Sequence, residues 1–143
     1  MCIAADLKPN DMQTSSQLTV GDTYSREDLA QKFGITDATL FTGIFRPKGH
    51  DSIWLFVTQE KTADRTQYED ELRGDDLYIE GQKSGRKDKL LAGHFESDLE
   101  VLLFYRKSKY EFPQAAFTYE GLFRYADHVS GPPTRFHFRR VTA

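Results

Sequence analysis

The sequence has very little cysteine: Cys2 stands alone among 143 residues, which excludes an internal disulfide and a cysteine-based metal site. No apolar run approaches the roughly 20 residues with which a helix crosses a bilayer. The first residues also lack the basic region and apolar stretch that mark a secretory signal. We therefore expect a cytoplasmic protein with no membrane partner.

Catalytic and cofactor-binding motifs are missing as well. There is no phosphate-cradling Walker loop, no serine nucleophile elbow and no dinucleotide fingerprint. The acidic run Glu69, Asp70 and Glu71 points adjacent carboxylates in different directions on any regular element, so an acid/base pair would need partners from elsewhere. No H-x-x-x-H spacing joins the histidines, which are His50, His94, His128 and His137. We expect neither an enzyme nor a bound metal or cofactor.

Aromatic residues are abundant, at 13% of the chain, with 11 Phe, 7 Tyr and 1 Trp. The formal net charge of −3 conceals an asymmetry along the chain. Residues 1–80 carry 8 basic against 15 acidic side chains, a balance of −7, whereas residues 81–143 carry 11 against 7, a balance of +4. A local basic face, rather than the average charge, decides whether a protein binds phosphates. The two halves can equally be two solvated faces of different charge.

A helix is predicted within residues 21–34, "GDTYSREDLAQKFG". Ser25 suits the N-cap, with Asp28 in the capping-box position. Leu29 and Phe33 share one face at i, i+4 spacing, and Gly34 ends the helix.

Six strand-like segments follow. The segments 52–58 and 100–108 are apolar on both faces, which is typical of central strands. A phase break at Glu120 and Gly121 predicts a bulge or bend. A polar loop or short helix is expected at 61–72, and a helical turn or loop at 89–95. The strand segments are 39–47, 52–58, 76–81, 100–108, 115–129 and 134–141.

These elements predict a β-rich α+β domain, in which an N-terminal helix precedes a curved, mostly antiparallel sheet or a small barrel. The length fits one domain, which we place at residues 21–143. The polar residues 1–20 are expected to form a flexible arm.

Aromatic and basic residues stand side by side at several places, such as Phe45-Arg46 and Phe123-Arg124-Tyr125. Such pairs can stack on bases and neutralise phosphates, although a strand with a core face and a wet face gives the same pattern. The loop within 78–89, "YIEGQKSGRKDK", is either a solvated turn or a loop that approaches a polyanion.

The order of the motifs carries a family resemblance. The chain reads "GDTYSREDLAQKFG", "TGIFRPKGHDSIWLFVT", "TQYEDEL", "YIEGQKSGRKDK", "EVLLFYRK" and "FTYEGLFRY", and ends "PPTRFHF". Over residues 21–140 this series resembles the small C-terminal reader domain of SauUSI-type, modification-dependent (type IV) restriction enzymes. It departs from that family where Gly81-Gln82 replaces a Ser-Gln step and where "DELRG" replaces "DeF".

The resemblance implies an SRA/PUA-like fold that reads a modified cytosine, 5-methyl or 5-hydroxymethyl, in duplex DNA by base flipping. Asp70 or Asp88 would accept from the cytosine amine, and Gln82 would fill the vacated stack or bond the orphan guanine. Stacking would come from Trp54, Tyr68 or Tyr78. The resemblance places the DNA backbone against Arg46, Lys48, Lys83, Ser84, Arg86, Lys87, Lys89 and Arg106.

The partners implied are double-stranded DNA with a modified base and, because the sequence contains neither a nuclease nor a helicase, a nuclease domain or subunit. Two alternatives stay open. One is an RNA or single-strand binding module that uses the same surface. The other is a protein-interaction domain, such as an immunity factor, that uses the acidic half.

Overall fold

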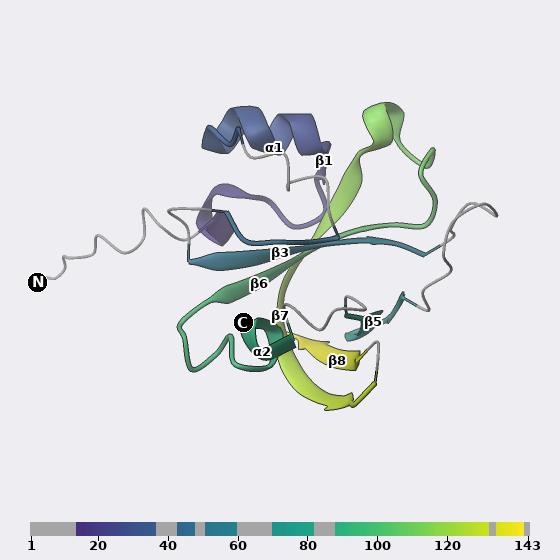
Figure 1. The fold of residues 1–143 in the computed structure, drawn as a ribbon. Helices are drawn as coiled ribbons and strands as arrows, with labels where there is room; N and C mark the ends of the chain where they lie inside the picture. The colour runs from purple at the N-terminus through teal and green to yellow at the C-terminus, as the bar shows by residue number, and fades with distance from the viewer. Residues whose placement is uncertain are drawn as a thin grey trace, which may run out of the picture.

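The computed structural model describes residues 14–36, 43–47, 51–59, 70–81, 88–131 and 134–141. Within these residues, eight strands form one sheet accompanied by two α-helices (Figure 1). The helices are α1 (Arg26–Phe33) and α2 (Asp88–Ala92), and short helical turns lie at Thr14–Gln17 and Pro113–Ala115. The strands are β1 (Thr23–Tyr24), β2 (Ile44–Phe45), β3 (Ser52–Thr58), β4 (Glu71–Arg73), β5 (Asp76–Glu80), β6 (Glu100–Arg106), β7 (Phe117–Val129) and β8 (Arg135–Arg140).

The strands lie side by side in the order β2, β3, β6, β7, β8, β5 and β4, and β1 pairs with β7. Every pair is antiparallel except β3 and β6, which run parallel. The predicted β-rich α+β class with a curved, mostly antiparallel sheet is confirmed. Of the two forms expected, the molecule has the open sheet, because β2 and β4 stand at opposite ends of the strand order.

Helix α1 begins and ends where the sequence predicts. The Ser25 hydroxyl accepts from the Asp28 N–H, and the Asp28 carboxylate accepts from the Ser25 N–H, each at 3.0 Å. Gly34 adopts the left-handed conformation at the C-cap, with φ 65°. Leu29 is fully buried and anchors the helix to the sheet.

Strands β3 and β6 lie inside the sheet and have buried side chains on both faces, as their sequences predict. One face packs against β5, β8 and α2 in a first core that includes Leu55, Val101 and Phe138. The other face packs against α1 in a second, aromatic core that includes Trp54 and Phe104. Consecutive residues of one strand therefore belong to different cores.

Strand β7 contains the predicted bulge. The pairing with β6 shifts at Glu120, and Gly121 there has φ 99°. Tyr119 consequently faces the second core while Phe123 faces the first. A further shift between Tyr125 and Asp127 bends the strand again where it pairs with β8. These irregularities curve the sheet so that β8 and β5 close over the first core (Figure 1).

The arm assigned to residues 1–20 needs a correction, since residues 14–20 are part of the folded body. The hydroxyl of Ser15 donates to the Glu100 carboxylate at 2.5 Å, and Leu18 packs on the second core. Residues 1–13 lie outside the described part. Among the described residues, no helix has the length and apolar character needed to span a membrane.

The segment 61–72 also needs a correction at its end, because Glu71–Arg73 forms strand β4 instead of a loop or helix. A turn at Gly74 and Asp75 folds β4 back onto β5, with Arg73 opposite Asp76. Gly74 has φ 60°, which suits such a hairpin turn. Residues 60–69 lie outside the described part.

Candidate functional site

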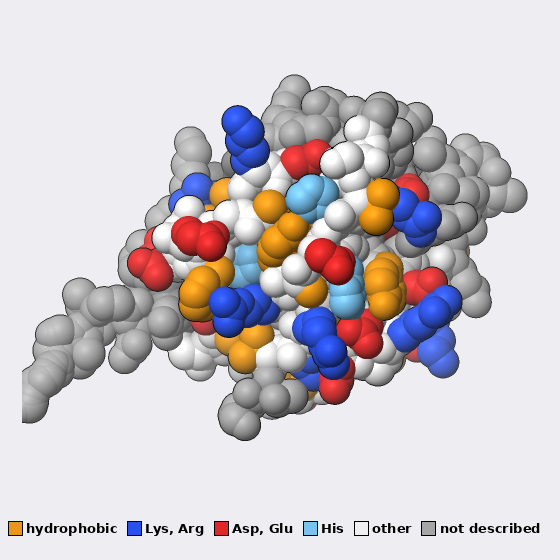
Figure 2. All heavy atoms as spheres, turned by 90° about the horizontal axis from the view of Figure 1, so that it is seen from below, with side chains coloured by type: hydrophobic (Ala, Val, Ile, Leu, Met, Phe, Trp, Pro, Cys, Tyr) orange, Lys and Arg blue, Asp and Glu red, His pale blue; other side chains and the backbone are white. Residues whose placement is uncertain are grey.

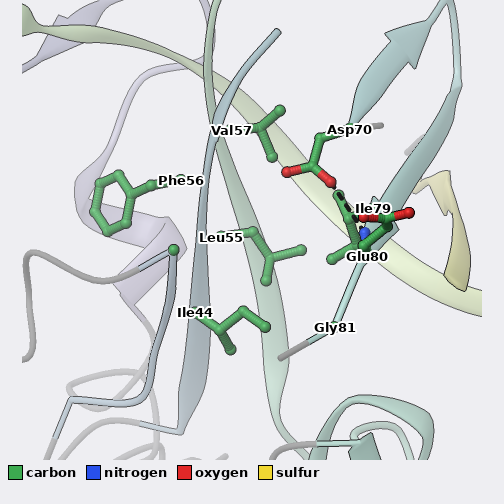
Figure 3. Close-up of a pocket in the computed structure, with 9 residues that line it drawn as sticks. Ile44, Leu55, Phe56, Val57, Asp70, Ile79, Glu80 and Gly81 are labelled. Atoms are coloured by element: carbon green, nitrogen blue, oxygen red, sulfur yellow. Dashed lines mark hydrogen bonds between the residues drawn. The ribbon is translucent and has the colours of Figure 1, made fainter. Parts of the chain in front are cut away.

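A pocket of about 160 Å³ lies between strands from opposite ends of the sheet order (Figure 3). Strands β2 and β3 form one side, and Asp70 with the end of β5 forms the other. We call it the seam pocket, since it sits where the curled sheet brings its two edges together. Its lining residues are Gly43, Ile44, Leu55, Phe56, Val57, Asp70, Ile79, Glu80 and Gly81.

The wall of the seam pocket is aliphatic. Leu55 and Val57 project from the same face of β3, because side chains alternate along a strand, and Phe56 points away toward the second core (Figure 3). Ile44 and Ile79 complete the wall from β2 and β5. This surface suits an apolar substituent or the flat face of a ring.

Asp70 brings a carboxylate to this apolar wall. It directly precedes β4, and its Oδ1 accepts a hydrogen bond from the Glu80 backbone N–H at 3.0 Å (Figure 3). The bond joins the start of β4 to the end of β5 and fixes the side chain at the pocket. A carboxylate held in this way is an acceptor for donors on a ligand.

Behind Gly81 lies a second carboxylate, that of Asp88. Its Oδ2 accepts from the Thr134 hydroxyl at 2.6 Å, and the Thr134 carbonyl accepts from the Gly81 N–H at 2.7 Å. Its Oδ1 is buried and has no hydrogen-bond partner among the described residues. A side chain at position 81 would collide with this oxygen, since a Cβ there would stand 2.8 Å from it. The structure thus keeps an unsatisfied acceptor beside the pocket lining.

The structure separates the other predicted pocket residues. Trp54 is fully buried in the second core, where its indole N–H donates to Ser52 at 3.0 Å, so its assignment as a base-stacking residue is corrected. Tyr78 faces the opposite side of β5 from Ile79 and stacks on His137 with ring centroids 4.7 Å apart. Neither residue lines the seam pocket. Tyr68 and Gln82 lie outside the described residues.

Among the predicted DNA-backbone residues, Arg46 and Lys89 are exposed. Arg106 is corrected: it is buried, and its guanidinium donates to Thr58 and to the Ala115 carbonyl, each at 2.7 Å. That burial lowers the pKa of Arg106. The remaining residues of this prediction, Lys48, Lys83, Ser84, Arg86 and Lys87, lie outside the described part.

A polar group that the sequence did not reveal lies on the outer face of β5, β8 and β7. His137 Nε2 lies 2.8 Å from Asp76 Oδ1, and its Nδ1 lies 3.3 Å from Asp127 Oδ1. The hydrogen bond from His137 lowers the pKa of Asp76. Only the strand register brings these residues together, since His137 pairs with Tyr78 on one side and with Asp127 on the other.

The face seen from below has charges of both signs around its histidine and hydrophobic side chains (Figure 2). Arginines on β8 lie close to carboxylates of β5, as Arg139 does to Asp76 at 3.4 Å and Arg135 to Glu80 at 3.9 Å. In the part of the chain that the structure describes, no group of three or more His, Cys, Asp or Glu side chains is suited to a metal ion.

A comparison with solved structures finds a similar fold in a chain described as a modification-dependent TagI restriction endonuclease. The TM-score is 0.50 and the sequence identity is 19%. The match covers 87% of this chain and 50% of the other, so this chain spans about half the length of that neighbour. No protein-family model matches the sequence, and no curated protein matches it. The likeness shows a shared fold.

Proposed function

We propose that this chain is a DNA-binding domain that reads a modified cytosine, with a 5-methyl or 5-hydroxymethyl group, in duplex DNA within a restriction or defence system. The observation that carries the proposal is the seam pocket, where an aliphatic wall meets the carboxylate of Asp70. The fold shared with a modification-dependent restriction endonuclease supports it, as does the ordered series of motifs in the sequence.

The size of the pocket suits one pyrimidine ring. A protein cavity of roughly 150 Å³ holds a benzene ring, and the seam pocket measures about 160 Å³. Ile44 and Ile79, which are 6% and 4% exposed, and Val57, which is 2% exposed, offer the apolar contact that a 5-methyl group gains from burial. A base paired inside a duplex cannot enter such a pocket, so the proposal includes flipping of the nucleotide out of the stack.

The carboxylate of Asp70 can distinguish 5-methylcytosine from thymine, which the aliphatic wall cannot do. Thymine has the same 5-methyl group as 5-methylcytosine, and a methyl niche alone would accept both. The two bases differ at position 4, where cytosine presents an amine donor and thymine a carbonyl acceptor. A carboxylate accepts from the amine and repels the carbonyl oxygen. Asp88 Oδ1 is a second acceptor, but it is buried behind Gly81 and does not line the pocket.

We further propose that the domain binds without catalysing a reaction. The sequence shows no catalytic motif. Cleavage, where it follows binding, would belong to a nuclease domain or subunit that works with this reader.

The experiment is a fluorescence-anisotropy titration at near-physiological salt. It compares duplexes with cytosine, 5-methylcytosine or thymine at one position, with the matching single strand as a fourth probe. We expect at least a tenfold preference for the methylated duplex, about 1.4 kcal/mol. In Asp70→Asn the amide can donate to a carbonyl, so discrimination against thymine should fall sharply. Asp75→Asn, the same change at an exposed carboxylate in the β4–β5 turn, should keep both preferences.

Three results would contradict the proposal. Equal, salt-sensitive binding of all probes would indicate a general nucleic-acid module, and a preference for the single strand would indicate an RNA or single-strand binder. No binding would indicate a protein partner.

A further inference from the structure

A second surface, apart from the seam pocket, is the loop 107–115 between β6 and β7, which we call the Tyr110 loop. Its tyrosine is 81% exposed, and the Lys109 ammonium lies 5.6 Å from the centre of its ring. Residues 110–115 surround an open hollow. A large aromatic ring held in solvent beside a cation is a combination that stacks on nucleobases.

The end of the loop at Gln114 and Ala115 is held in place although its backbone is strained. Gln114 and Ala115 both have left-handed conformations, with φ 60° and 57°, which are unfavourable for residues with a Cβ. Arg106 holds them in place, because its guanidinium lies 4.0 Å from the Phe117 ring centroid and donates to the Ala115 carbonyl at 2.7 Å. Strain of this kind persists only where the surroundings impose it, and it often accompanies binding.

The outward charge of the loop is basic. Lys107 and Lys109 are exposed, whereas Glu111 turns its Oε1 back to accept from the Lys107 N–H at 2.7 Å. This hydrogen bond uses one oxygen of Glu111, which carries the single carboxylate within the loop. Two exposed ammonium groups favour a negatively charged partner, and the phosphates of DNA are such a partner.

The loop and the seam pocket share one end of the sheet. Strands β3 and β6 are parallel, with Val57 opposite Tyr105 and Thr58 opposite Arg106. Val57 lines the pocket, and the loop begins directly after Arg106, at the carboxyl ends of both strands (Figure 1). A duplex that presents a base to the pocket would pass this end of the molecule.

We propose that the Tyr110 loop is a second DNA contact, in which Tyr110 stacks on a base or at a base step while Lys107 and Lys109 meet phosphates. This inference rests on the proposed function. Every base has a face on which a ring can stack, so the contact adds affinity without reading the modification.

The test measures Tyr110→Ala and Tyr110→Phe against the methylated and unmethylated duplexes by anisotropy. We expect Tyr110→Ala to weaken binding of both duplexes by about tenfold, within the range for loss of one stacked base. The ratio between the duplexes should not change, and Tyr110→Phe should bind as the wild type does, since it keeps the ring. Phe95→Ala is the matched control: that ring is 55% exposed and lies 3.7 Å from the Arg124 guanidinium carbon. It should leave both affinities unchanged.

Failure of this inference is distinguishable from failure of the proposed function. If Tyr110→Ala binds with wild-type affinity and keeps the preference for methylated DNA, the loop contact alone is overturned. The exposed ring would then indicate a contact with a protein partner. Loss of the preference without loss of affinity for unmethylated DNA would place Tyr110 in base reading and also overturn it. Absence of any DNA binding by the wild type would overturn both proposals.

Discussion

At the scale of single residues, His94 shows how burial fixes a protonation state. The residue is 3% exposed and lies just after α2, where its ring contacts Leu99, directly before β6, and Tyr125 in β7. Its Nδ1 lies 2.9 Å from the Leu99 carbonyl, which can only accept, so Nδ1 holds the proton. Its Nε2 therefore accepts from the Tyr125 N–H at 3.0 Å. Protonation of Nε2 would remove that acceptor, and burial lowers the pKa of His94 from its usual 6.5.

This geometry predicts a loss of stability in mild acid. Because the pKa of His94 is lower in the folded than in the unfolded chain, its contribution is fully present above about pH 6.5 and falls as the pH drops below that value. Urea unfolding at pH 7.5 and pH 5 measures the change. We expect His94→Gln to be destabilised by about 1–3 kcal/mol at pH 7.5 and to depend less on pH than the wild type.

The control for this prediction is His128→Gln, which changes an exposed histidine on β7. It should keep the pH dependence of the wild type. Equal pH dependence in His94→Gln and the wild type would show that His94 is not the group responsible.

The candidate site was accessible to sequence reasoning only in part, for a physical reason. The family resemblance indicated Asp70 and Asp88, of which Asp70 lines the seam pocket and Asp88 lies directly behind its lining. The aromatic candidates Trp54 and Tyr78 depended on which face of a strand they occupy. Local sequence does not give that face for β3, whose two sides are both apolar and belong to different cores.

At the scale of elements, the hairpin of β4 and β5 positions the carboxylate of the pocket. Asp70 directly precedes β4, and its Oδ1 accepts from the Glu80 N–H at the far end of β5. The hairpin turns at Gly74, whose φ is 60°. A Cβ added there would meet no atom within 4 Å, so a substitution changes the backbone preference and little else.

We predict that Gly74→Ala destabilises the domain by about 1 kcal/mol, the usual penalty for a left-handed residue with a Cβ. Gly74→Asn should cost less, because asparagine tolerates this conformation. Hydrogen exchange of the Glu80 amide, which donates to Asp70, reports whether the hairpin loosens. We expect faster exchange in the alanine variant than in the asparagine variant. Identical behaviour of the two variants would mean that the turn conformation does not control the hairpin.

Elements with strong local signals were predictable, whereas those that depend on pairing between distant segments were not. The cap at Ser25, the stop at Gly34 and the bulge at Glu120 are read from neighbouring residues. Strand β4 has three residues and exists because it pairs with β5. The parallel pairing of β3 with β6 joins segments more than 40 residues apart, and no local pattern specifies it.

At the scale of the whole molecule, the net charge of −3 opposes the approach of DNA. Acidic side chains remote from the seam pocket contribute to this repulsion without touching a base. Glu27 on α1 and Glu96 after α2 are both exposed, and replacing both by glutamine changes the net charge from −3 to −1. The long-range field acts on every duplex alike, so it changes the affinity for all duplexes without changing the preference for methylated DNA.

We therefore predict that Glu27→Gln combined with Glu96→Gln binds methylated and unmethylated duplexes about two- to threefold more tightly at low salt, with the ratio between them unchanged. The gain should fade at about 0.5 M salt, where the Debye length is near 4 Å. The charge-conserving pair Glu27→Asp and Glu96→Asp is the matched control and should bind as the wild type does. Anisotropy titrations at several salt concentrations measure all three proteins. A change in the ratio would contradict the division between a long-range field that acts on every duplex alike and a pocket that selects the base.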